Sequence, residues 1–201
     1  MGLILNGNAP NKILYNGAEV TLYFNGSKIW PNVAPVLDEV TIGTQTWKTK
    51  NLAIDDGQGG IVTQTVNYGQ GDVVEYYYTW EAAVRVAASI SGWHLPSYSE
   101  MWDTLRKAVD VGANAGTKLK STYGWSSGNG TDDYGFAAFP AGTWTSGGGF
   151  KKFGSEAYFW TATVPSTTTV AYYCHFTTDT SMSGGTFSKK VGCSVRLVKD
   201  S

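Results

Sequence analysis

The sequence has few charged residues. Only 15% of its 201 residues are charged, and 15 basic side chains nearly balance 16 acidic ones, for a net charge of −1. A nucleic-acid-binding domain needs a basic surface that attracts phosphates. The composition therefore excludes nucleic acid as the expected partner.

Long apolar runs are also missing. No stretch approaches the ~18 apolar residues of a membrane helix, and Met1–Pro10 lacks both the basic start and the long apolar middle of a secretory signal. We therefore expect a soluble chain without membrane insertion and without a signal peptide in this sequence.

Cysteine and histidine are scarce, with only two of each: Cys174, Cys193, His94 and His175. Two cysteines cannot build a disulfide framework and lack the paired spacing of a zinc site, so one bridge and two free thiols both stay open. A histidine without a partner is a poor general base. We expect His94 to pack in or stabilise a turn, and His175 to lie on a binding surface.

Known catalytic motifs are absent as well. The sequence has no Gly-x-Ser-x-Gly elbow, no His-Glu-x-x-His helix and no phosphate-binding glycine loop. Asp55-Asp56 and Asp132-Asp133 lie in Gly-rich loops, where solvated turn residues are favoured over oxygen ligands of a cation. We expect no enzyme, no cofactor and no metal.

Glycine and aromatic residues are abundant, at 25 Gly, 8 Trp, 12 Tyr and 8 Phe, which favours short strands and shaped loops. Two helices are predicted. Thr79 can cap a helix at 79–90, whose apolar face holds Ala82, Ala83, Val86, Ala87 and Ile90. Ser97 and Glu100 form a capping box for a helix at 97–110, with an apolar stripe of Met101, Leu105, Ala108 and Val109.

Strand-like segments lie before and after these helices. They comprise a hairpin at 39–47 around Gly43, and runs at 61–68, 136–139, 159–163, 170–177 and 193–198. This order predicts an α+β fold in which two helices pack on one mixed or antiparallel sheet. Arg196 stands inside an apolar strand and predicts a paired internal charge, since a buried arginine without a carboxylate is costly.

The first thirty residues repeat a short apolar run that ends in Asn-Gly, at Asn6-Gly7, Asn16-Gly17 and Asn25-Gly26. Asn-Gly suits tight hairpin turns, so the pattern predicts a β-meander with strands near 12–15, 19–24 and 27–30. Such a ribbon is too small to be stable alone. We therefore expect residues 1–34 to attach or assemble the protein, and residues 35–201 to form the main domain.

Several ordered motifs of the main domain resemble one family. They are Val40–Trp47 with Asn51-Leu52, Gly92–Ser97 with Glu100, Gly135-Phe136, Phe139–Gly142, Phe159–Thr163 and Ser194–Asp200. Together they resemble the Fibrobacter succinogenes major paralogous domain family, which is similar in fold to C-type lectins and to formylglycine-generating enzymes. The resemblance implies two helices, a twisted sheet and a loop-rich second half. Some members resemble the variable proteins of diversity-generating retroelements, whose gene ends are rewritten through adenine mutagenesis.

The chain departs from this pattern in three respects. The calcium-binding tripeptides of sugar-binding C-type lectins are missing, Leu197 stands where the family often has cysteine, and the two cysteines lack the catalytic context of formylglycine-generating enzymes. Calcium-dependent sugar binding, a family disulfide and an oxidase activity therefore do not carry over. The framework aromatics Trp47, Trp93, Phe136, Phe139, Phe159 and Trp160 are expected in the core.

The binding face is predicted between the framework motifs, where diversified relatives vary. It comprises Trp144, Lys151, Ser155, Glu156, Tyr158, Pro165, Thr167, Thr169, Tyr173, His175, Thr177 and Asp179. Strand alternation places Tyr173, His175 and Thr177 on one face, expected to be exposed, and Tyr172, Cys174 and Phe176 on the other. Replacing the first three with alanine is therefore expected to leave the melting temperature nearly unchanged.

The sequence thus indicates a ligand-binding protein with a diversifiable face, the variable protein of a diversity-generating retroelement in a phage or bacterium. Its expected partner is a protein or glycan ligand on a cell surface, with attachment to a carrier or to itself through residues 1–34. Its expected location is a phage tail or a bacterial surface. The alternative is a secreted or cell-surface carbohydrate-binding domain of the same fold that is never diversified.

Overall fold

The computed structural model describes residues 38–166 and 169–199, and, nearer the N-terminus, the strands of four short segments. The chain divides into two units, Met1–Leu37 and Asp38–Ser201. In the first unit β1 (Leu14–Tyr15) pairs with β2 (Ala18–Glu19), and β3 (Leu22–Phe24) pairs with β4 (Ser27–Trp30), both antiparallel. Each pair has one of the predicted Asn-Gly dipeptides between its strands, and residues 20–21, in the middle of the strand predicted at 19–24, lie outside the described residues. The first repeat, with Asn6-Gly7, lies outside the described residues.

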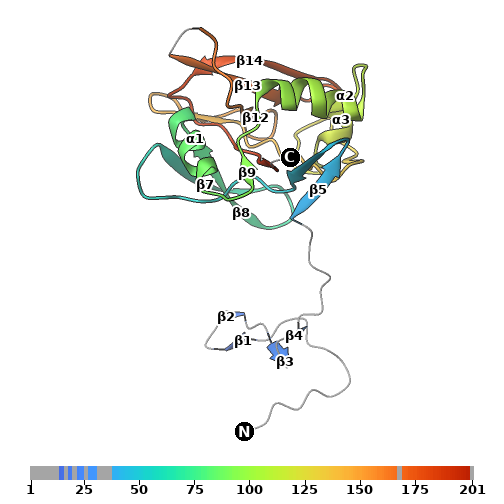
Figure 1. Ribbon diagram of the computed structural model, residues 1–201, viewed down its shortest axis with the longest axis vertical. Coiled ribbons are helices and arrows are strands. Elements are labelled where there is room, and N and C mark those ends of the chain that lie inside the picture. Colours follow the sequence, from blue (N-terminus) through green and yellow to red (C-terminus); the bar gives the residue numbers. More distant parts are fainter. Residues whose placement is uncertain are drawn as a thin grey trace. The chain divides into compact units, whose positions relative to one another are not determined.

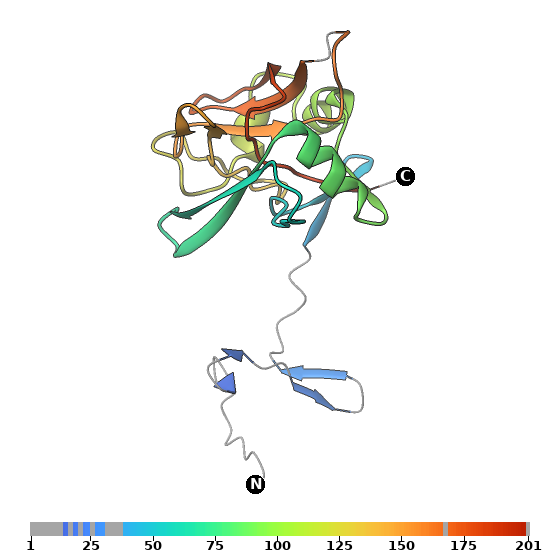
Figure 2. The same cartoon turned by 90° about the vertical axis from the view of Figure 1, so that its left-hand side faces the viewer.

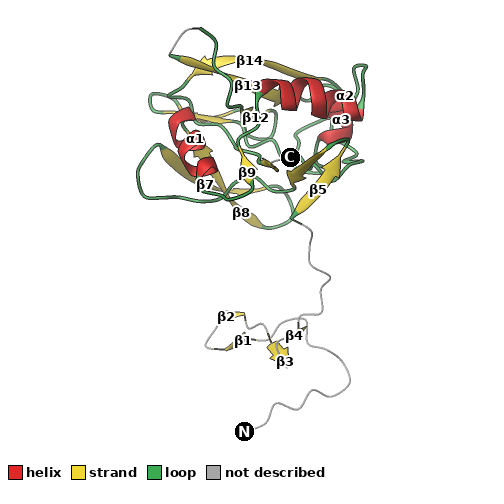
Figure 3. Cartoon of the chain, viewed as in Figure 1, coloured by secondary structure: helices red, strands yellow, loops and turns green. Residues whose placement is uncertain are grey.

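The second unit is an α+β domain, as predicted. Its strands are β5 (Glu39–Ile42), β6 (Gln45–Lys48), β7 (Ile61–Asn67), β8 (Asp72–Tyr78), β9 (Trp93–His94), β10 (Thr143–Thr145), β11 (Gly149–Lys151), β12 (Ala157–Trp160), β13 (Val170–Phe176), β14 (Met182–Ser188) and β15 (Val198–Lys199). Its helical elements are α1 (Trp80–Ala88), the π-helix η1 (Glu100–Leu105), α2 (Arg106–Val109) and α3 (Ala115–Leu119). Loops make up much of the domain, above all between α3 and β10 (Figure 3).

The expected single sheet is instead four small ones. Their strand orders are β5-β6-β15-β9, β7-β8, β10-β11 and β12-β13-β14. The segment before β15 joins three of them through isolated bridges: Gly192 to Trp144, Cys193 to Tyr78 and Ser194 to Phe159. The strand expected at 193–198 is reduced to Val198–Lys199 because this segment changes partner at almost every residue.

Both predicted helix starts are confirmed. The Thr79 side chain accepts a hydrogen bond from the Ala82 N–H, and α1 buries Ala82, Ala83, Val86 and Ala87. At the second helix the Ser97 hydroxyl accepts from the Glu100 N–H at 3.1 Å, while the Glu100 carboxylate accepts from the Ser97 N–H at 2.7 Å. These are the two reciprocal bonds of a capping box.

The second helix differs from a regular one in its middle. At Leu105 the π-helix gives way to α2, and the Arg106 N–H donates five residues back to the Met101 carbonyl. A π-turn is wider than an α-turn, so positions beyond it rotate relative to a 3.6-residue stripe. Met101, Leu105 and Val109 are buried as expected, but Ala108 is exposed.

Helix α3 was not predicted. Its Gly116 weakens the helix signal, yet any Cβ there would lie only 2.5 Å from the Ser181 carbonyl oxygen. The expected strand at 136–139 is absent because Ala137 has a positive φ of 49° and only Ala138 makes a bridge, to Lys120. Close packing thus overrides local propensity in this region.

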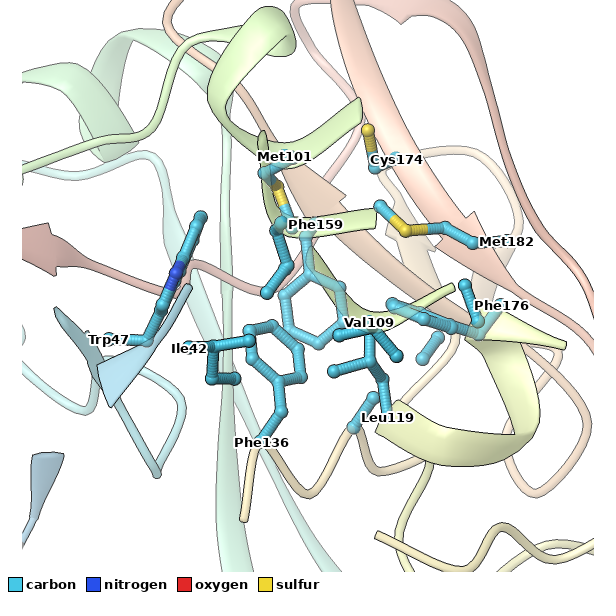
Figure 4. Packing of buried hydrophobic residues seen from close by; sticks show 14 of the residues in the cluster. Ile42, Trp47, Met101, Val109, Leu119, Phe136, Phe159, Cys174, Phe176 and Met182 are labelled. Atoms are coloured by element: carbon cyan, nitrogen blue, oxygen red, sulfur yellow. The ribbon is translucent and has the colours of Figure 1, made fainter. Parts of the chain in front are cut away.

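Two apolar clusters fill the domain. The first gathers Phe136, Phe159 and Phe176, whose ring centroids lie 6.0–6.3 Å apart, against the second helix and the β5–β6 hairpin (Figure 4). The second packs α1 against Tyr78 and Trp160. Trp47, Phe136, Phe159 and Trp160 are buried as expected, whereas Trp93 and Phe139 are only half-buried.

The capping box gives a direct test of helix stability. Ser97→Ala should lower the free energy of unfolding by about 1 kcal/mol, because it leaves the Glu100 N–H without its acceptor. Ser99→Ala is the matched control, since Ser99 lies on the exposed side of the same turn and its hydroxyl bonds only to Asp103 at 3.0 Å among the contacts described. Urea unfolding of both variants checks this, and an equal loss in the two would contradict the role of Ser97.

Candidate ligand-binding face

The sheet β12-β13-β14 carries the centre of the predicted binding face. Strand register places Tyr158 opposite His175, and His175 opposite Ser183. These three side chains therefore stand in one row across the three strands, since directly paired residues point to the same side of a sheet. Figures 1 and 2 show β13 and β14 running along one edge of the domain, away from the β7–β8 hairpin.

The burial of β13 follows the predicted alternation except at Tyr172, which shares the face of Cys174 and Phe176 but is half-exposed. Cys174 and Phe176 are fully buried in the first cluster, while Tyr173, His175 and Thr177 lie on the other face and are half-exposed. These three side chains are less exposed than expected, because the second cluster covers part of that face. Ala171 lies there too and is fully buried.

Four rings on this face form an aromatic platform, which we define as Tyr158, Tyr173, His175 and Phe187. Tyr173 stacks on Phe187 with ring centroids 4.1 Å apart, and His175 stacks on Tyr158 at 5.1 Å with an interplanar angle of 8°. Tyr158 also meets Tyr173 at 5.3 Å. These contacts fix the orientation of each ring, so the platform is preorganised for binding.

The packing corrects one expectation about stability. Tyr158 is only 7% exposed, and Tyr173 packs against the second cluster. Changing Tyr173, His175 and Thr177 together to alanine would remove these ring contacts, so an unchanged melting temperature is no longer expected.

One ion pair lies beside the platform. The Glu156 carboxylate accepts from Lys152 Nζ at 2.7 Å and also from the Tyr158 hydroxyl. Burial tends to raise the pKa of Glu156, but these two donors outweigh it and hold that pKa below its ordinary value. Burial, together with the Glu156 carboxylate, raises the pKa of Tyr158, so the phenol stays a neutral donor.

The pair of His175 and Ser183 lacks the geometry of a catalytic dyad. The Ser183 hydroxyl oxygen lies 3.0 Å from Nδ1 and 3.2 Å from Nε2 of His175. An oxygen almost equally near both ring nitrogens cannot lie along the lone-pair direction of either one. Burial also lowers the pKa of His175, opposed by Glu156, so the ring is neutral near pH 7.

The remaining predicted residues are spread around this centre. Trp144 and Lys151 lie on the β10–β11 hairpin and Ser155 follows it, while Pro165 and Thr169 precede β13, and Thr177 and Asp179 follow it. Thr167 lies outside the described residues. Thr169 and Thr177 are separated by the whole length of β13, about 26 Å at the usual rise per residue. The structure therefore brings together Glu156, Tyr158, Tyr173 and His175, and does not gather the whole set into one patch.

Sequence reasoning missed three residues of this centre: Lys152, Ser183 and Phe187. Ser183 and Phe187 lie on the platform side of β14, which no motif marked as a strand because Gly184 and Gly185 interrupt its apolar pattern. Alternation of Ser183, Gly185 and Phe187 was the available signal. Lys152 has a positive φ of 66°, a backbone conformation that the sequence does not predict for a lysine.

The remaining cysteines and acidic loop residues are explained by burial or by contacts within the protein. Cys174 and Cys193 are free and buried, and burial raises the pKa of both thiols, which disfavours the reactive thiolate. Asp56 forms an ion pair with Arg85 at 2.7 Å, and Asp132 accepts from the Ala137 N–H at 2.7 Å.

Among the described residues no three His, Cys, Asp or Glu side chains cluster as metal ligands. Within that same part of the chain, no helix is long and apolar enough to cross a membrane.

The predicted internal charge of Arg196 has a partner network rather than a direct ion pair. Arg196 is 1% exposed, and its guanidinium donates to the carbonyls of Lys48, Phe136 and Ala137 and to the Asn51 amide oxygen at 2.8 Å. Asn51 in turn donates to Glu75 at 3.1 Å. Burial lowers the pKa of Arg196, and the nearby carboxylates of Glu75 and Asp132 oppose this.

Removing this guanidinium should strongly destabilise the folded protein. Arg196→Met keeps the apolar stem of the side chain but leaves buried carbonyls without donors and removes the cation that offsets the charge of Glu75, so we expect a loss of about 3–5 kcal/mol in the free energy of unfolding. Lys199→Met is the control, because Lys199 is an exposed cation three residues further on, 3.6 Å from Glu39. Its loss should stay within about 1 kcal/mol. Denaturant unfolding measures both, and similar values would contradict the central role of Arg196.

Comparison with known proteins bears on the family. The sequence profile of the Fibrobacter succinogenes major domain matches residues 40–199, which covers the second unit almost completely. Neither a comparison with curated proteins nor one with solved structures finds a match. The matched range runs from the first strand of the domain to the last, so the chain belongs to the Fibrobacter succinogenes major domain family.

Proposed function

We propose that this chain is a binding protein that recognises a ligand displayed on a cell surface through the aromatic platform, and that it is not an enzyme. The observation that carries the proposal is the set of stacked, half-exposed rings of Tyr173, His175 and Phe187 above the buried Tyr158. Rings held in place offer large contact area at little entropic cost on binding.

Polar groups at the edge of the platform support the same function. Ser183, Glu156 and Lys152 provide a hydroxyl, a carboxylate and an ammonium within one neighbourhood of the rings. Interfaces commonly combine aromatic anchors with a rim of adaptable hydrogen-bonding groups. This composition suits a protein ligand and a glycan alike.

The proposal extends to origin and location. We take the domain to have a C-type-lectin-like fold, supported by its two longer helical segments, its small antiparallel sheets and its loop-rich second half. We take the protein to be the variable protein of a diversity-generating retroelement, carried on a phage tail or a bacterial surface. The alternative is a carbohydrate-binding domain that is never diversified. A near-copy of the 3′ end of the gene beside a reverse-transcriptase gene would favour the variable protein of a diversity-generating retroelement over this alternative.

The binding role of the platform can be separated from its packing role. Tyr173→Ala should weaken capture about 30-fold, since a central aromatic commonly contributes ~2 kcal/mol or more to an interface. Tyr76→Ala is the matched control, because both tyrosines are half-buried against the second cluster and Tyr76 lies on β8, outside the platform. Fluorescently labelled protein, tested on a panel of bacterial cells and on a glycan microarray, gives the measurement.

Stability and binding then give distinct signatures. Both variants should lose stability to a similar degree, while only Tyr173→Ala loses binding. Equal binding by the two variants would refute the platform as the binding face. Hits on the glycan array alone would favour the carbohydrate-binding alternative.

The first unit is proposed to attach the protein to a carrier or to another copy. Deleting residues 1–34 should leave the melting temperature of the remaining domain nearly unchanged, since the chain divides at Leu37 and Asp38 and both apolar clusters lie after that point. Light scattering should show that the shortened protein has fewer copies in its assembly than the full chain, or that it no longer binds its carrier protein. Unfolding of the shortened chain would show instead that the first unit belongs to the core.

A further inference from the structure

A second concave site lies away from the aromatic platform. It is a pocket of about 300 Å³, which we call the β8 pocket, and its wall includes Leu52, Tyr68, Val74, Tyr123 and Phe139. None of its lining residues belongs to the platform or to the predicted binding face. β8 lies at the opposite side of the domain from β14 in Figure 1. This size is at the lower end for a small-molecule site.

The floor of the β8 pocket is polar and buried. Glu75 is 6% exposed, and its two carboxylate oxygens accept from the Tyr68 hydroxyl and the Asn51 amide, each at 3.1 Å. A carboxylate has room for about four donors. Two acceptor positions on Glu75 therefore remain for a ligand, among the contacts described.

Most of the neighbouring donors are already bonded. The terminal nitrogens of Arg196 donate to three carbonyls and the Asn51 oxygen, while its Nε is buried and makes no hydrogen bond among the contacts described. At the rim, Lys50 pairs with Asp38 at 3.2 Å. The pocket thus offers a free acceptor at its floor and few free charged donors, which favours a ligand that donates hydrogen bonds.

The walls favour a positive charge with an apolar body. Tyr68 packs on Phe139 at 4.9 Å, and Phe139 meets Tyr123 at 5.0 Å, so three rings line one side. Aromatic faces attract cations, more strongly where water is excluded. Val73 and Val74 remain 46% and 48% exposed in succession at the mouth, an apolar surface that a bound ligand would cover.

We propose that the β8 pocket binds a small organic ammonium ion, with the ammonium on Glu75 and a compact apolar group between Val74 and the rings of Tyr68, Tyr123 and Phe139. A sugar fits less well, because the wall around the acceptor is mainly apolar and leaves most hydroxyls without partners. This site is independent of the proposed surface recognition.

The test uses the full chain and three probes that share a phenylethyl group. Phenethylammonium is the cation, 2-phenylethanol the neutral analogue and 3-phenylpropionate the anion. In two-dimensional amide NMR at millimolar concentrations, the cation should shift signals of residues around the pocket, such as Leu52, Gly71 and Glu75. It should bind roughly ten-fold or more tightly than either analogue, because its bond to the carboxylate is charge-assisted.

Three variants test whether the pocket is responsible for the binding. Val74→Trp should fill the mouth and abolish the shifts, while Val164→Trp, the same substitution at a 42% exposed valine outside the pocket, should retain them. Glu75→Gln should remove the preference for the cation over the alcohol. Binding unaffected by Val74→Trp, shifts centred on the aromatic platform, no preference for the cation, or no shifts at all would each overturn the proposal.

Discussion

The buried guanidinium of Arg196 is the constraint on which the second unit depends. It lies in the segment between the isolated bridges and β15, and its donors reach backbone carbonyls at Lys48, Phe136 and Ala137. Those of Phe136 and Ala137 belong to loop backbone that no ladder holds. A neutral apolar side chain could fill the same space but would leave these carbonyls unpaired, at a cost of about 1–3 kcal/mol for each. Arg196 therefore takes the place of sheet hydrogen bonds where strands are short.

The same segment explains why the sheets are small. Gly192, Cys193 and Ser194 each bridge a different strand or hairpin, and Val198 pairs with both Trp47 and His94. One extended stretch thus connects the four sheets, and it passes through the interior with every residue from Cys193 to Val198 buried. Since the tertiary contacts come from distant parts of the chain, no local pattern could specify them. The sequence does show the apolar alternation that gave the expected strand.

Features with local causes were predicted well. The caps at Thr79 and Ser97 are satisfied within three residues, and the turn at Gly43, with a φ of 62°, joins β5 to β6 as expected. The π-helix, the loop conformation of Ala137 and the short α3 have no comparable local signal. In the candidate site, strand alternation correctly assigned Cys174 and Phe176 to the core. The burial of Tyr158 and the contribution of Phe187 depend on the register of three strands, which composition does not encode.

The two faces of β12-β13-β14 also limit where variation is tolerable. Across the sheet, His175 and Ser183 are half-exposed beside the buried Tyr158, whereas Trp160 and Ala171 on the same face are fully buried in the second cluster. Trp160 is further held by its indole N–H, which donates to the Tyr78 carbonyl at 2.8 Å. Substitutions at His175 or Ser183 meet mainly the platform rings and solvent, while changes at Trp160 or Ala171 would create cavities or clashes in the core. If the protein is diversified as proposed, variation should therefore concentrate at the His175 end of the sheet and spare the end covered by α1.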